Sequence, residues 1–382
     1  MPIKFIDYGT IIQYNNIVGN IAYERKCKMV SDENFRKVKP YVPGEQPKND
    51  DVIKLNTNEN PYPPSPKVLE VLGNIGNSSF RKYPDPEVSD LVQALADYHN
   101  VKRENVFVGV GSDDVIAMCF MTFFNGGKPV LFPDISYAFY KVWADLLKVN
   151  YDEIPLDNDF KIIPDDYFKE NGGIIFPNPN APTGLVLGLD KVESIIASSP
   201  KTVVIVDEAY IDFGGESALS LIDKYDNLIV TRTYSKSRAM AGMRIGYCVG
   251  SAELIKVLNS VKFSYNSYTM SDIAIKTGIA SLKDEDYFKQ TVGRIVDTRE
   301  KTKRELNRLG FTFLDSSSNF IFAKHKDIDG EQLFNALKKN KIFVRHFNSE
   351  KIKDYLRITI GTEDEMKSLI DFLKRYLGYK EV

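Results

Sequence analysis

Short, unbroken apolar runs alternate with helix-like segments along most of the chain. The runs lie at residues 106–110, 129–132, 173–176, 202–206 and 228–230. A run that is apolar on both faces is typical of a strand with helices packed on either side, as in a parallel sheet. The pattern therefore predicts an α/β fold in which a mostly parallel sheet is covered by helices.

The pattern changes near residue 261. A long helical stretch at 271–309 is followed by strand-like runs at 319–322, 342–345 and 355–360. This change predicts a large domain at 61–260 and a smaller α+β domain at 261–382. Residues 1–28 are rich in Asn and lack a clear period, so we expect an atypical extension there, with Met29 as an alternative start and 29–60 as an N-terminal arm.

Composition argues against several classes of function. A net charge of -2 gives no reason to expect nucleic acid as a partner. The three cysteines form no CxxC pair and the chain has only three histidines, so neither a disulfide framework nor a metal site is indicated. Apolar runs fall short of the roughly 20 residues that span a bilayer, and the first 28 residues lack a signal-peptide pattern. We therefore expect a cytoplasmic protein without a membrane partner.

One lysine follows closely on the apolar run that starts at residue 228. The amine of Lys236 is suited to condense with an aldehyde such as that of pyridoxal phosphate. The hydroxyls of Thr233 and Ser235 and the guanidinium of Arg244 would suit the phosphate of that cofactor. Taken alone, this stretch suggests a pyridoxal-phosphate site with Lys236 as its catalytic residue, and the residues at the other strand ends strengthen the prediction.

Further polar residues follow the ends of the predicted strands, where ligands bind in open α/β sheets. Ser112 and Asp113 open a helix that could bind an anion, although an ordinary N-cap would also explain them. Asp207 could pair with a protonated pyridine nitrogen or cap the next helix. Tyr210 could donate to the 3-oxygen of the ring. Tyr137 could stack on the ring, although such a tyrosine often belongs to the core.

Two further segments invite a functional interpretation. The turn at 177–184 holds three prolines and a glycine, which suits either a cofactor-positioning loop or a tight surface turn. Alternation along the strand at 356–360 places Arg357 and Thr359 on one face. Arg357, and Arg345 at the end of another strand, could clamp a carboxylate or phosphate, although surface ion pairing explains most arginines.

Together these segments resemble the fold-type-I pyridoxal-phosphate aminotransferases. In chain order they are Asn58-Glu-Asn-Pro61, Arg81-Lys-Tyr-Pro-Asp85, the turn at 177–184, Asp207-Glu-Ala-Tyr210, the stretch from Ser235-Lys236 to Arg244, and Arg357. Within that family the chain is most similar to the histidinol-phosphate aminotransferases, through residues 39–44, 55–61, 207–213 and 356–362. The resemblance extends over about residues 36–380 and implies a large domain with a mostly parallel sheet and a smaller α+β domain.

The resemblance implies functions for the cofactor residues. Lys236 would bind pyridoxal 5'-phosphate covalently and carry a proton during the reaction. Asp207 would hold the pyridinium, Tyr210 the phenolic oxygen and Tyr137 the face of the ring. The phosphate would be held by Ser112, Asp113, Thr233, Ser235 and Arg244.

The resemblance also implies a homodimer with shared active sites. Tyr83 would reach the cofactor phosphate of the second subunit. Tyr41 on the N-terminal arm, together with Asn58, would lie on the substrate side of the site. Arg345 and Arg357 would bind the acidic groups of the substrates.

One position departs from the family pattern. The family usually has an Asn that bonds the 3-oxygen of the cofactor where this chain has Ala181. Asn180 or Asn178 could reach this oxygen through a shifted turn, or Tyr210 could serve alone. We favour Asn180.

The implied reaction is a two-stage amino transfer in histidine biosynthesis. Glutamate and imidazole-acetol phosphate would be converted into 2-oxoglutarate and L-histidinol phosphate. An aromatic or broad-range aminotransferase, or a threonine-phosphate decarboxylase, would share the cofactor residues and remains an alternative. A non-catalytic protein that binds pyridoxal phosphate is a remote alternative, because Lys236 is present.

Overall fold

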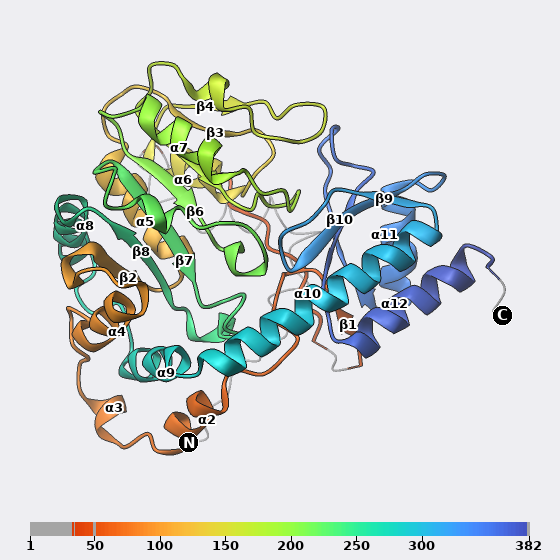
Figure 1. The fold of residues 1–382 in the computed structure, drawn as a ribbon, viewed down its shortest axis with the longest axis horizontal. Helices are drawn as coiled ribbons and strands as arrows, with labels where there is room; N and C mark the ends of the chain where they lie inside the picture. Colours follow the sequence, from red (N-terminus) through yellow and green to blue (C-terminus); the bar gives the residue numbers. More distant parts are fainter. Residues whose placement is uncertain (1–32, 34, 49–50, 380–382) are drawn as a thin grey trace. The chain divides into compact units, whose positions relative to one another are not determined.

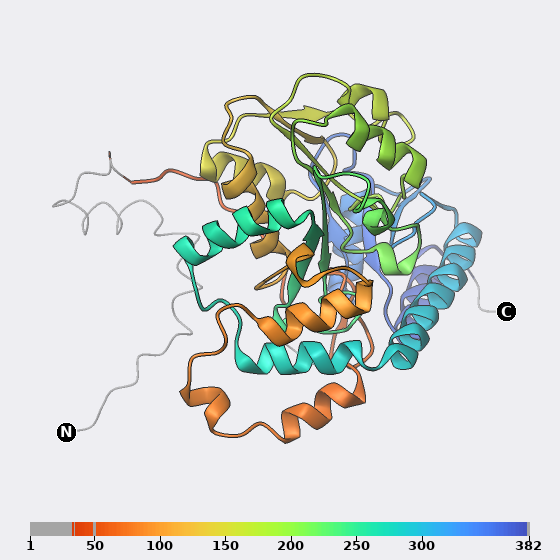
Figure 2. The ribbon, with the colours of Figure 1, turned by 60° about the vertical axis from the view of Figure 1, so that its left-hand side comes forward.

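The computed structural model describes residues 33, 35–48 and 51–379. The chain divides into two units, residues 1–40 and residues 41–382. Residues 35–40 of the first unit have no regular secondary structure, and the fold below is that of the second unit (Figures 1 and 2). The predicted extension at 1–28 and the alternative start at Met29 lie outside the described residues.

A seven-stranded sheet forms the centre of the second unit, in the order β2-β8-β7-β6-β5-β3-β4. Its strands are β2 (Val106–Gly109), β3 (Val130–Pro133), β4 (Tyr151–Ile154), β5 (Gly173–Pro177), β6 (Val204–Asp207), β7 (Leu228–Thr233) and β8 (Gly246–Gly250). Only β8 runs antiparallel to its neighbours, β2 and β7, among the described strands of this sheet. The prediction of a mostly parallel sheet is therefore confirmed.

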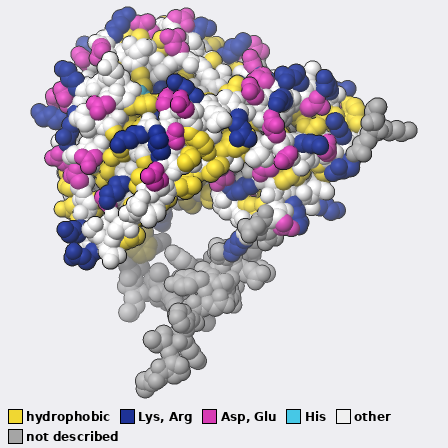
Figure 3. Space-filling model, turned by 60° about the horizontal axis from the view of Figure 1, so that its bottom comes forward, with side chains coloured by type: hydrophobic (Ala, Val, Ile, Leu, Met, Phe, Trp, Pro, Cys, Tyr) yellow, Lys and Arg dark blue, Asp and Glu magenta, His cyan; other side chains and the backbone are white. Residues whose placement is uncertain are grey.

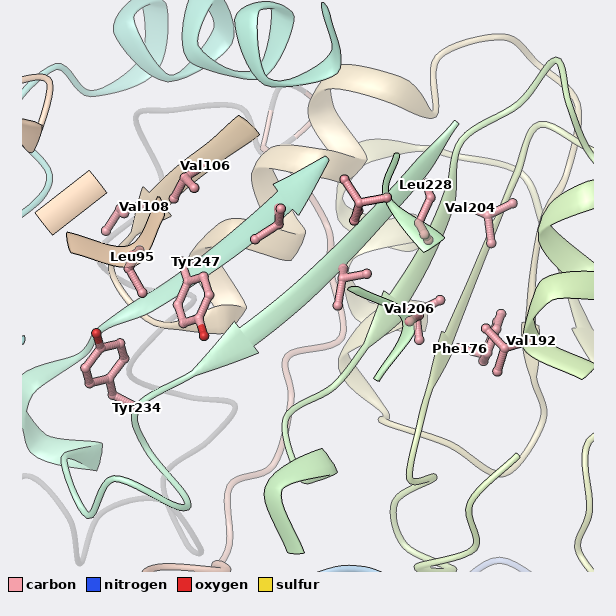
Figure 4. Packing of buried hydrophobic residues seen from close by; sticks show 14 of the residues in the cluster. Leu95, Val106, Val108, Phe176, Val192, Val204, Val206, Leu228, Tyr234 and Tyr247 are labelled. Atoms are coloured by element: carbon pink, nitrogen blue, oxygen red, sulfur yellow. The ribbon is translucent and has the colours of Figure 1, made fainter. Parts of the chain in front are cut away.

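Successive residues of the central strands pack against different helix layers. Val204 and Val206 of β6 belong to one apolar cluster, and Ile205 between them belongs to another. The first cluster includes residues of α4 (Ser89–His99), α7 (Leu189–Ser198) and α9 (Asp272–Leu282), and Figure 4 shows part of it. The second includes residues of α5 (Ser112–Phe123), α6 (Phe139–Leu147) and α8 (Ala252–Tyr265). Burial on both faces explains why these strands are apolar without alternation.

The last part of the chain builds a second, antiparallel sheet, in the order β12-β13-β10-β9. Its strands are β9 (Phe311–Phe313), β10 (Phe320–His325), β12 (Arg345–His346) and β13 (Leu356–Thr359). The helices here are α10 (Glu285–Arg308), α11 (Gly330–Lys339) and α12 (Glu363–Tyr376). In addition, β1 (Ile53–Lys54) pairs in parallel with β11 (Ile342–Phe343), so the segment after residue 50 joins this part of the molecule.

Shorter elements complete the unit. They are α2 (Pro66–Gly73), α3 (Ser78–Arg81) and the 3-10 turns Arg103–Asn105, Pro164–Tyr167, Ile211–Phe213, Ala218–Leu221 and Ala241–Met243. Sequence patterns did not predict β4 and β8, because β4 is partly exposed and polar and β8 begins and ends with glycine.

Two predicted boundaries differ from the helices of the structure. The helical stretch expected at 271–309 is two helices, α9 and α10, which are separated at residues 283–284. The expected domain boundary near residue 260 falls inside α8, which packs on α5 and β2. The division into a large and a small domain stays a prediction.

Charged side chains of both signs are interspersed across the face shown in Figure 3, with hydrophobic groups between them. Among the described residues, no helix is both long and apolar enough to cross a membrane.

Candidate active site

The sheet brings the predicted cofactor residues to one edge. Because β8 runs antiparallel to both β2 and β7, the strands β2, β3, β5, β6 and β7 all point in the same direction. The residues at or just after their carboxyl ends are Ser112, Tyr137, Asn180, Asp207 and Thr233. This is the edge where ligands are expected in an open α/β sheet.

An anion cradle lies at the start of α5. The first intrahelical bond there runs from the N–H of Val115 to the carbonyl of Gly111, at 3.2 Å, so the helix start presents N–H groups together with its dipole. Gly111 has a φ of 88°, and a Cβ on it would lie 2.5 Å from Nη2 of Arg244. Glycine therefore lets the guanidinium lie against the helix start, where it also pairs with Asp113 at 3.2 Å. These groups fit a phosphate.

Two hydroxyls follow β7 at the same edge of the sheet. Thr233 Oγ1 donates to Ser235 Oγ at 3.0 Å, and the N–H of Ser235 donates to Thr233 Oγ1 at 3.1 Å. The start of β8 comes close to the cradle, because a Cβ on Gly246 would lie 2.2 Å from the backbone nitrogen of Ser112. This close approach places β7 and β8 beside the start of α5.

Asp207 ends β6 as a buried carboxylate. Its Oδ2 accepts from the hydroxyl of Tyr140 at 2.7 Å, and its Oδ1 accepts from the N–H of Ala209 and from Thr231 Oγ1, both at 3.3 Å. Burial raises its pKa to about 6, although these hydrogen bonds oppose the shift. It has no Lys or Arg partner among the described residues. A protonated pyridine nitrogen would supply the missing positive charge.

Lys236 is held by the segment that precedes α2. Its Nζ donates to the carbonyl of Thr57 at 3.2 Å and lies 5.7 Å from the centre of the Tyr210 ring. The amide of Asn60 donates to the carbonyls of Lys236 and Ser237, both at 3.1 Å. Because one side chain binds both carbonyls, the backbone that carries the lysine is fixed.

Two predicted site tyrosines make contacts around the start of α6. The hydroxyl of Tyr137 donates to Oδ1 of Asp113 at 2.7 Å, and burial raises the pKa of Tyr137 well above its usual range. The nearby Tyr210 and Asp207 also raise the pKa of Tyr137 through charge repulsion. Tyr41 packs on Phe139 with ring centres 4.3 Å apart. The structure thus places Tyr137 beside the cradle and near Asp207, and its contact with the cofactor ring stays a prediction.

Arg345 and Arg357 face each other across β12 and β13 as register partners. Arg357 Nη2 donates to the carbonyl of Asn56 at 3.1 Å, while its buried Nε has no partner. Arg345 Nη2 donates to the carbonyl of Val42 at 3.4 Å. Burial lowers the pKa of Arg357, and the charge of Arg345 adds to this. Like charges opposite each other destabilise a sheet, so the pair suits a bound anion.

The turn after β5 does not favour the predicted donor. Asn180 Nδ2 donates to the carbonyl of Ile135 at 3.0 Å and to Thr183 Oγ1 at 3.1 Å, which uses both of its hydrogens. Asn178 bonds Leu187 through its amide nitrogen at 3.0 Å and its amide oxygen at 2.8 Å. Asn180 thus ties the turn to the segment after β3, and its predicted contact with the cofactor oxygen stays a prediction.

Asn58 and Tyr83 differ sharply in exposure. Asn58 is 1% exposed and donates from Nδ2 to the hydroxyl of Tyr210 at 2.8 Å, so its contact with substrate stays a prediction. Tyr83 is 81% exposed and packs on Tyr268 with ring centres 4.6 Å apart. Its predicted role in a second subunit also stays a prediction.

Three residues that touch the site were missed from the sequence. Tyr140 follows Tyr137 by three residues, a helical spacing that could have suggested a shared position. Thr57 and Asn60 flank or belong to the Asn-Glu-Asn-Pro motif, whose side-chain partners no sequence pattern reveals. All three act through contacts with residues that are distant in the chain.

Comparison with known proteins decides the family. Residues 50–373 match the family model for aminotransferase class I and II. The chain belongs to this family. Among curated aminotransferases it is 50% identical over 348 residues to histidinol-phosphate aminotransferase of Lactococcus lactis subsp. cremoris, covering 91% of this chain and 98% of the relative. It is 49% identical to the enzyme of the same name from Brachyspira hyodysenteriae, with the same coverage.

Solved aminotransferase structures share the fold. The histidinol-phosphate aminotransferase of Clostridium acetobutylicum superposes with a TM-score of 0.79 at 24% identity, covering 86% of this chain and all of that one. The enzyme of the same name from Sinorhizobium meliloti, solved with pyridoxal-5'-phosphate, gives a TM-score of 0.79 at 25% identity, covering 85% and 91%. The predicted fold class, the predicted resemblance and the prediction of an aminotransferase are confirmed.

Proposed function

We propose that this aminotransferase binds pyridoxal 5'-phosphate and exchanges an amino group between glutamate and imidazole-acetol phosphate, forming L-histidinol phosphate. The names of its relatives support this substrate. The observation that carries the proposal is the pair Arg345 and Arg357, which lack a carboxylate partner among the described residues. Planar, permanently charged guanidiniums can bind both a carboxylate and a phosphate monoester, as the two half-reactions require.

The chain's own residues divide the work at the site. Asp207 holds a cation at the buried edge of the sheet, and the start of α5 with Arg244 binds the phosphate. Pyridoxal phosphate, when bound, supplies an electron sink for the charge left on the substrate's α-carbon. Nζ of Lys236 carries the proton away from that carbon. The arginines hold the substrate's acidic group so that the α-carbon faces the lysine.

An absorbance titration tests this proposal. Purified protein with added pyridoxal phosphate should show a long-wavelength band. Histidinol phosphate should shift the band to shorter wavelength, and 2-oxoglutarate should restore it. Lys236→Ala should lack the band, whereas the exposed control Lys201→Ala should keep it.

Other outcomes separate the alternatives. A band that responds to glutamate or phenylalanine but not to histidinol phosphate would refute the substrate and leave the aminotransferase. Release of carbon dioxide without an oxo-acid acceptor would indicate a decarboxylase. Absence of the band in the unmodified protein would refute the function proposed for Lys236.

We further propose a homodimer with shared sites. Phe80, Tyr83, Tyr265 and Tyr268 are 71%, 81%, 69% and 48% exposed, which is unusual for large aromatic side chains. A second copy of the chain would cover them and bring Tyr83 to the partner's phosphate cradle. We also propose a cytoplasmic location, because the described cysteines, Cys119 and Cys248, are free and buried.

Hybrid dimers test the shared site. Lys236→Ala and Tyr83→Phe should each be weakly active alone. Co-expression with two different tags yields hybrids in which one site has both intact residues, so about half of the wild-type activity per dimer should return. Hybrids that are no more active than either variant would contradict a shared site.

A further inference from the structure

Asn58 is fixed in a conformation that few residues adopt. Its φ is 56°, in the left-handed region where Asn is tolerated better than most side chains, and it is 1% exposed. Its carbonyl accepts from Asn319 Nδ2 at 3.0 Å. Its side chain lies between Tyr210 and Thr359, which are 149 residues apart in the chain and come from different parts of the fold.

The hydrogen bonds around Asn58 run in one direction in this structure. The N–H of Asn58 donates to Thr359 Oγ1 at 3.0 Å. The same oxygen lies 3.0 Å from Asn58 Oδ1, which can only accept, so the single hydroxyl hydrogen of Thr359 points to Oδ1. In this orientation the amide nitrogen of Asn58 faces Tyr210. In that 2.8 Å bond the tyrosine oxygen is the acceptor.

The hydroxyl hydrogen of Tyr210 is consequently left for another acceptor. The described residues offer none, although the side chain of Tyr210 is only 9% exposed. Lys236 Nζ lies 5.7 Å from the centre of the same ring, so the ring of Tyr210 lies beside the lysine of the proposed cofactor site. A phenol that accepts one hydrogen bond is also a stronger donor in the next.

In the neighbouring turn, Ala181 and Asn180 do not supply a second donor. Ala181 has no polar side chain, and both amide hydrogens of Asn180 bind Ile135 and Thr183. Asn178 is bonded to Leu187 through both ends of its amide. Of Tyr210, Asn180 and Ala181, only Tyr210 has a side-chain hydrogen that binds no described residue.

We propose that Asn58 and Thr359 are positioning residues that aim the hydroxyl hydrogen of Tyr210 at the ring oxygen of the bound cofactor. Thr359 fixes the orientation of the Asn58 amide. Because the amide nitrogen then faces Tyr210, the hydroxyl of Tyr210 cannot donate to Asn58. This inference rests on the proposed function, because it needs pyridoxal phosphate in the site. The inference gives Asn58 a function in orienting the hydroxyl of Tyr210, in addition to its predicted contact with substrate.

The pH midpoint of the cofactor's long-wavelength band reports on this donor. A hydrogen bond to the negative ring oxygen stabilises that charge and so makes the nearby cofactor nitrogen a weaker base. Losing the bond should raise the midpoint. For a hydrogen bond to a charged group, the expected rise is about one pH unit.

Thr359→Val is the main variant, because it keeps the shape and removes the hydroxyl. Without the hydroxyl of Thr359, the amide of Asn58 can rotate so that its oxygen faces Tyr210. That oxygen would then accept the hydrogen bond from the Tyr210 hydroxyl. The midpoint should rise toward that of Tyr210→Phe, and Thr359→Ser should restore the wild-type value. Thr312→Val, an exposed threonine on β9 of the same sheet, is the matched control and should change nothing.

The double variant separates positioning from general damage. In a Tyr210→Phe background, Thr359→Val should produce no further rise, because its effect passes through the phenol. An equal rise in both backgrounds would overturn the inference. If Thr359→Val does not fold, Asn58→Gly tests the same series of hydrogen bonds, because glycine adopts the positive φ and lacks the side-chain amide. Asn58→Gly should raise the pH midpoint in the protein that keeps Tyr210. In the Tyr210→Phe background it should leave the midpoint unchanged.

The two proposals fail in different ways. If pyridoxal phosphate produces no band in the unmodified protein, the proposed function falls and this inference falls with it. If the band appears, and Thr359→Val and Asn58→Gly both titrate like wild type, the inference alone is overturned.

Discussion

Replacing Asp207 by Asn should raise the stability of the cofactor-free protein. The same replacement should reduce the additional stability that bound cofactor provides. The carboxylate is 5% exposed, and its pKa is raised from 3.8 to about 6 by burial. The folded protein therefore binds this proton more tightly than the unfolded chain does. As pH rises from about 4 to 6, the wild type loses stability through this group, and above that window the loss is constant. Asn resembles the protonated acid and escapes the loss.

The size of the effect follows from the pKa. A shift of about 2 pH units corresponds to roughly 3 kcal/mol of unfolding free energy, at about 1.4 kcal/mol per unit. The unfolding entropy of a 382-residue chain is on the order of 0.8 kcal/mol per degree, so the cofactor-free variant should melt about 4 °C higher at pH 8. At pH 5 the carboxylate is mostly protonated in the folded state, and the gain should fall to about half.

Thermal unfolding at pH 5 and pH 8, with and without pyridoxal phosphate, measures these differences. The cofactor should raise the melting temperature of the wild type more than that of Asp207→Asn, since only the carboxylate can pair with a pyridinium. A gain in the cofactor-free variant that is the same at both pH values would refute a raised pKa. An equal effect of the cofactor on both proteins would refute the pairing.

Three further substitutions probe separate parts of the site. Gly111→Ala should lower the affinity for pyridoxal phosphate at least tenfold in a fluorescence titration, because its Cβ would lie 2.5 Å from Nη2 of Arg244; unchanged affinity would refute the cradle. Tyr140→Phe removes the 2.7 Å bond to Asp207 and should weaken cofactor binding by about tenfold, the size of one hydrogen bond to a charge; tighter binding would contradict this. Arg357→Gln should raise the KM for histidinol phosphate at least a hundredfold while the cofactor band persists; an unchanged KM would exclude Arg357 from substrate binding.

Much of the fold and the cofactor edge follows from local sequence. The central strands are apolar on both faces, and this pattern alone indicates strands with helices on either side. Polar residues at strand ends, such as Asp207 and Thr233, could be assigned to one edge because parallel strands end together. Lys236 stood out because it follows a strand in a stretch of hydroxyls and arginines.

The sequence could not show how distant segments complete the site. Asn58 and Thr359 are separated by 301 residues, and their hydrogen bonds depend on the backbone turn at Asn58. Asn180 could be proposed as a donor from the sequence, but its hydrogen bond to the carbonyl of Ile135, 45 residues earlier, could not be predicted. The direction of a hydrogen bond depends on which partners surround a group in space.

Local chemistry thus determined what kinds of groups this protein offers: a reactive lysine, a buried acid, a phosphate-binding helix start and two arginines. Tertiary structure decided which of them act together. Arg345 and Arg357 became a pair through sheet register, and Tyr210 became a directed donor through Asn58. The physical reason is that periodicity and propensity act over a few residues, whereas burial, register and hydrogen-bond direction arise only when the chain has packed.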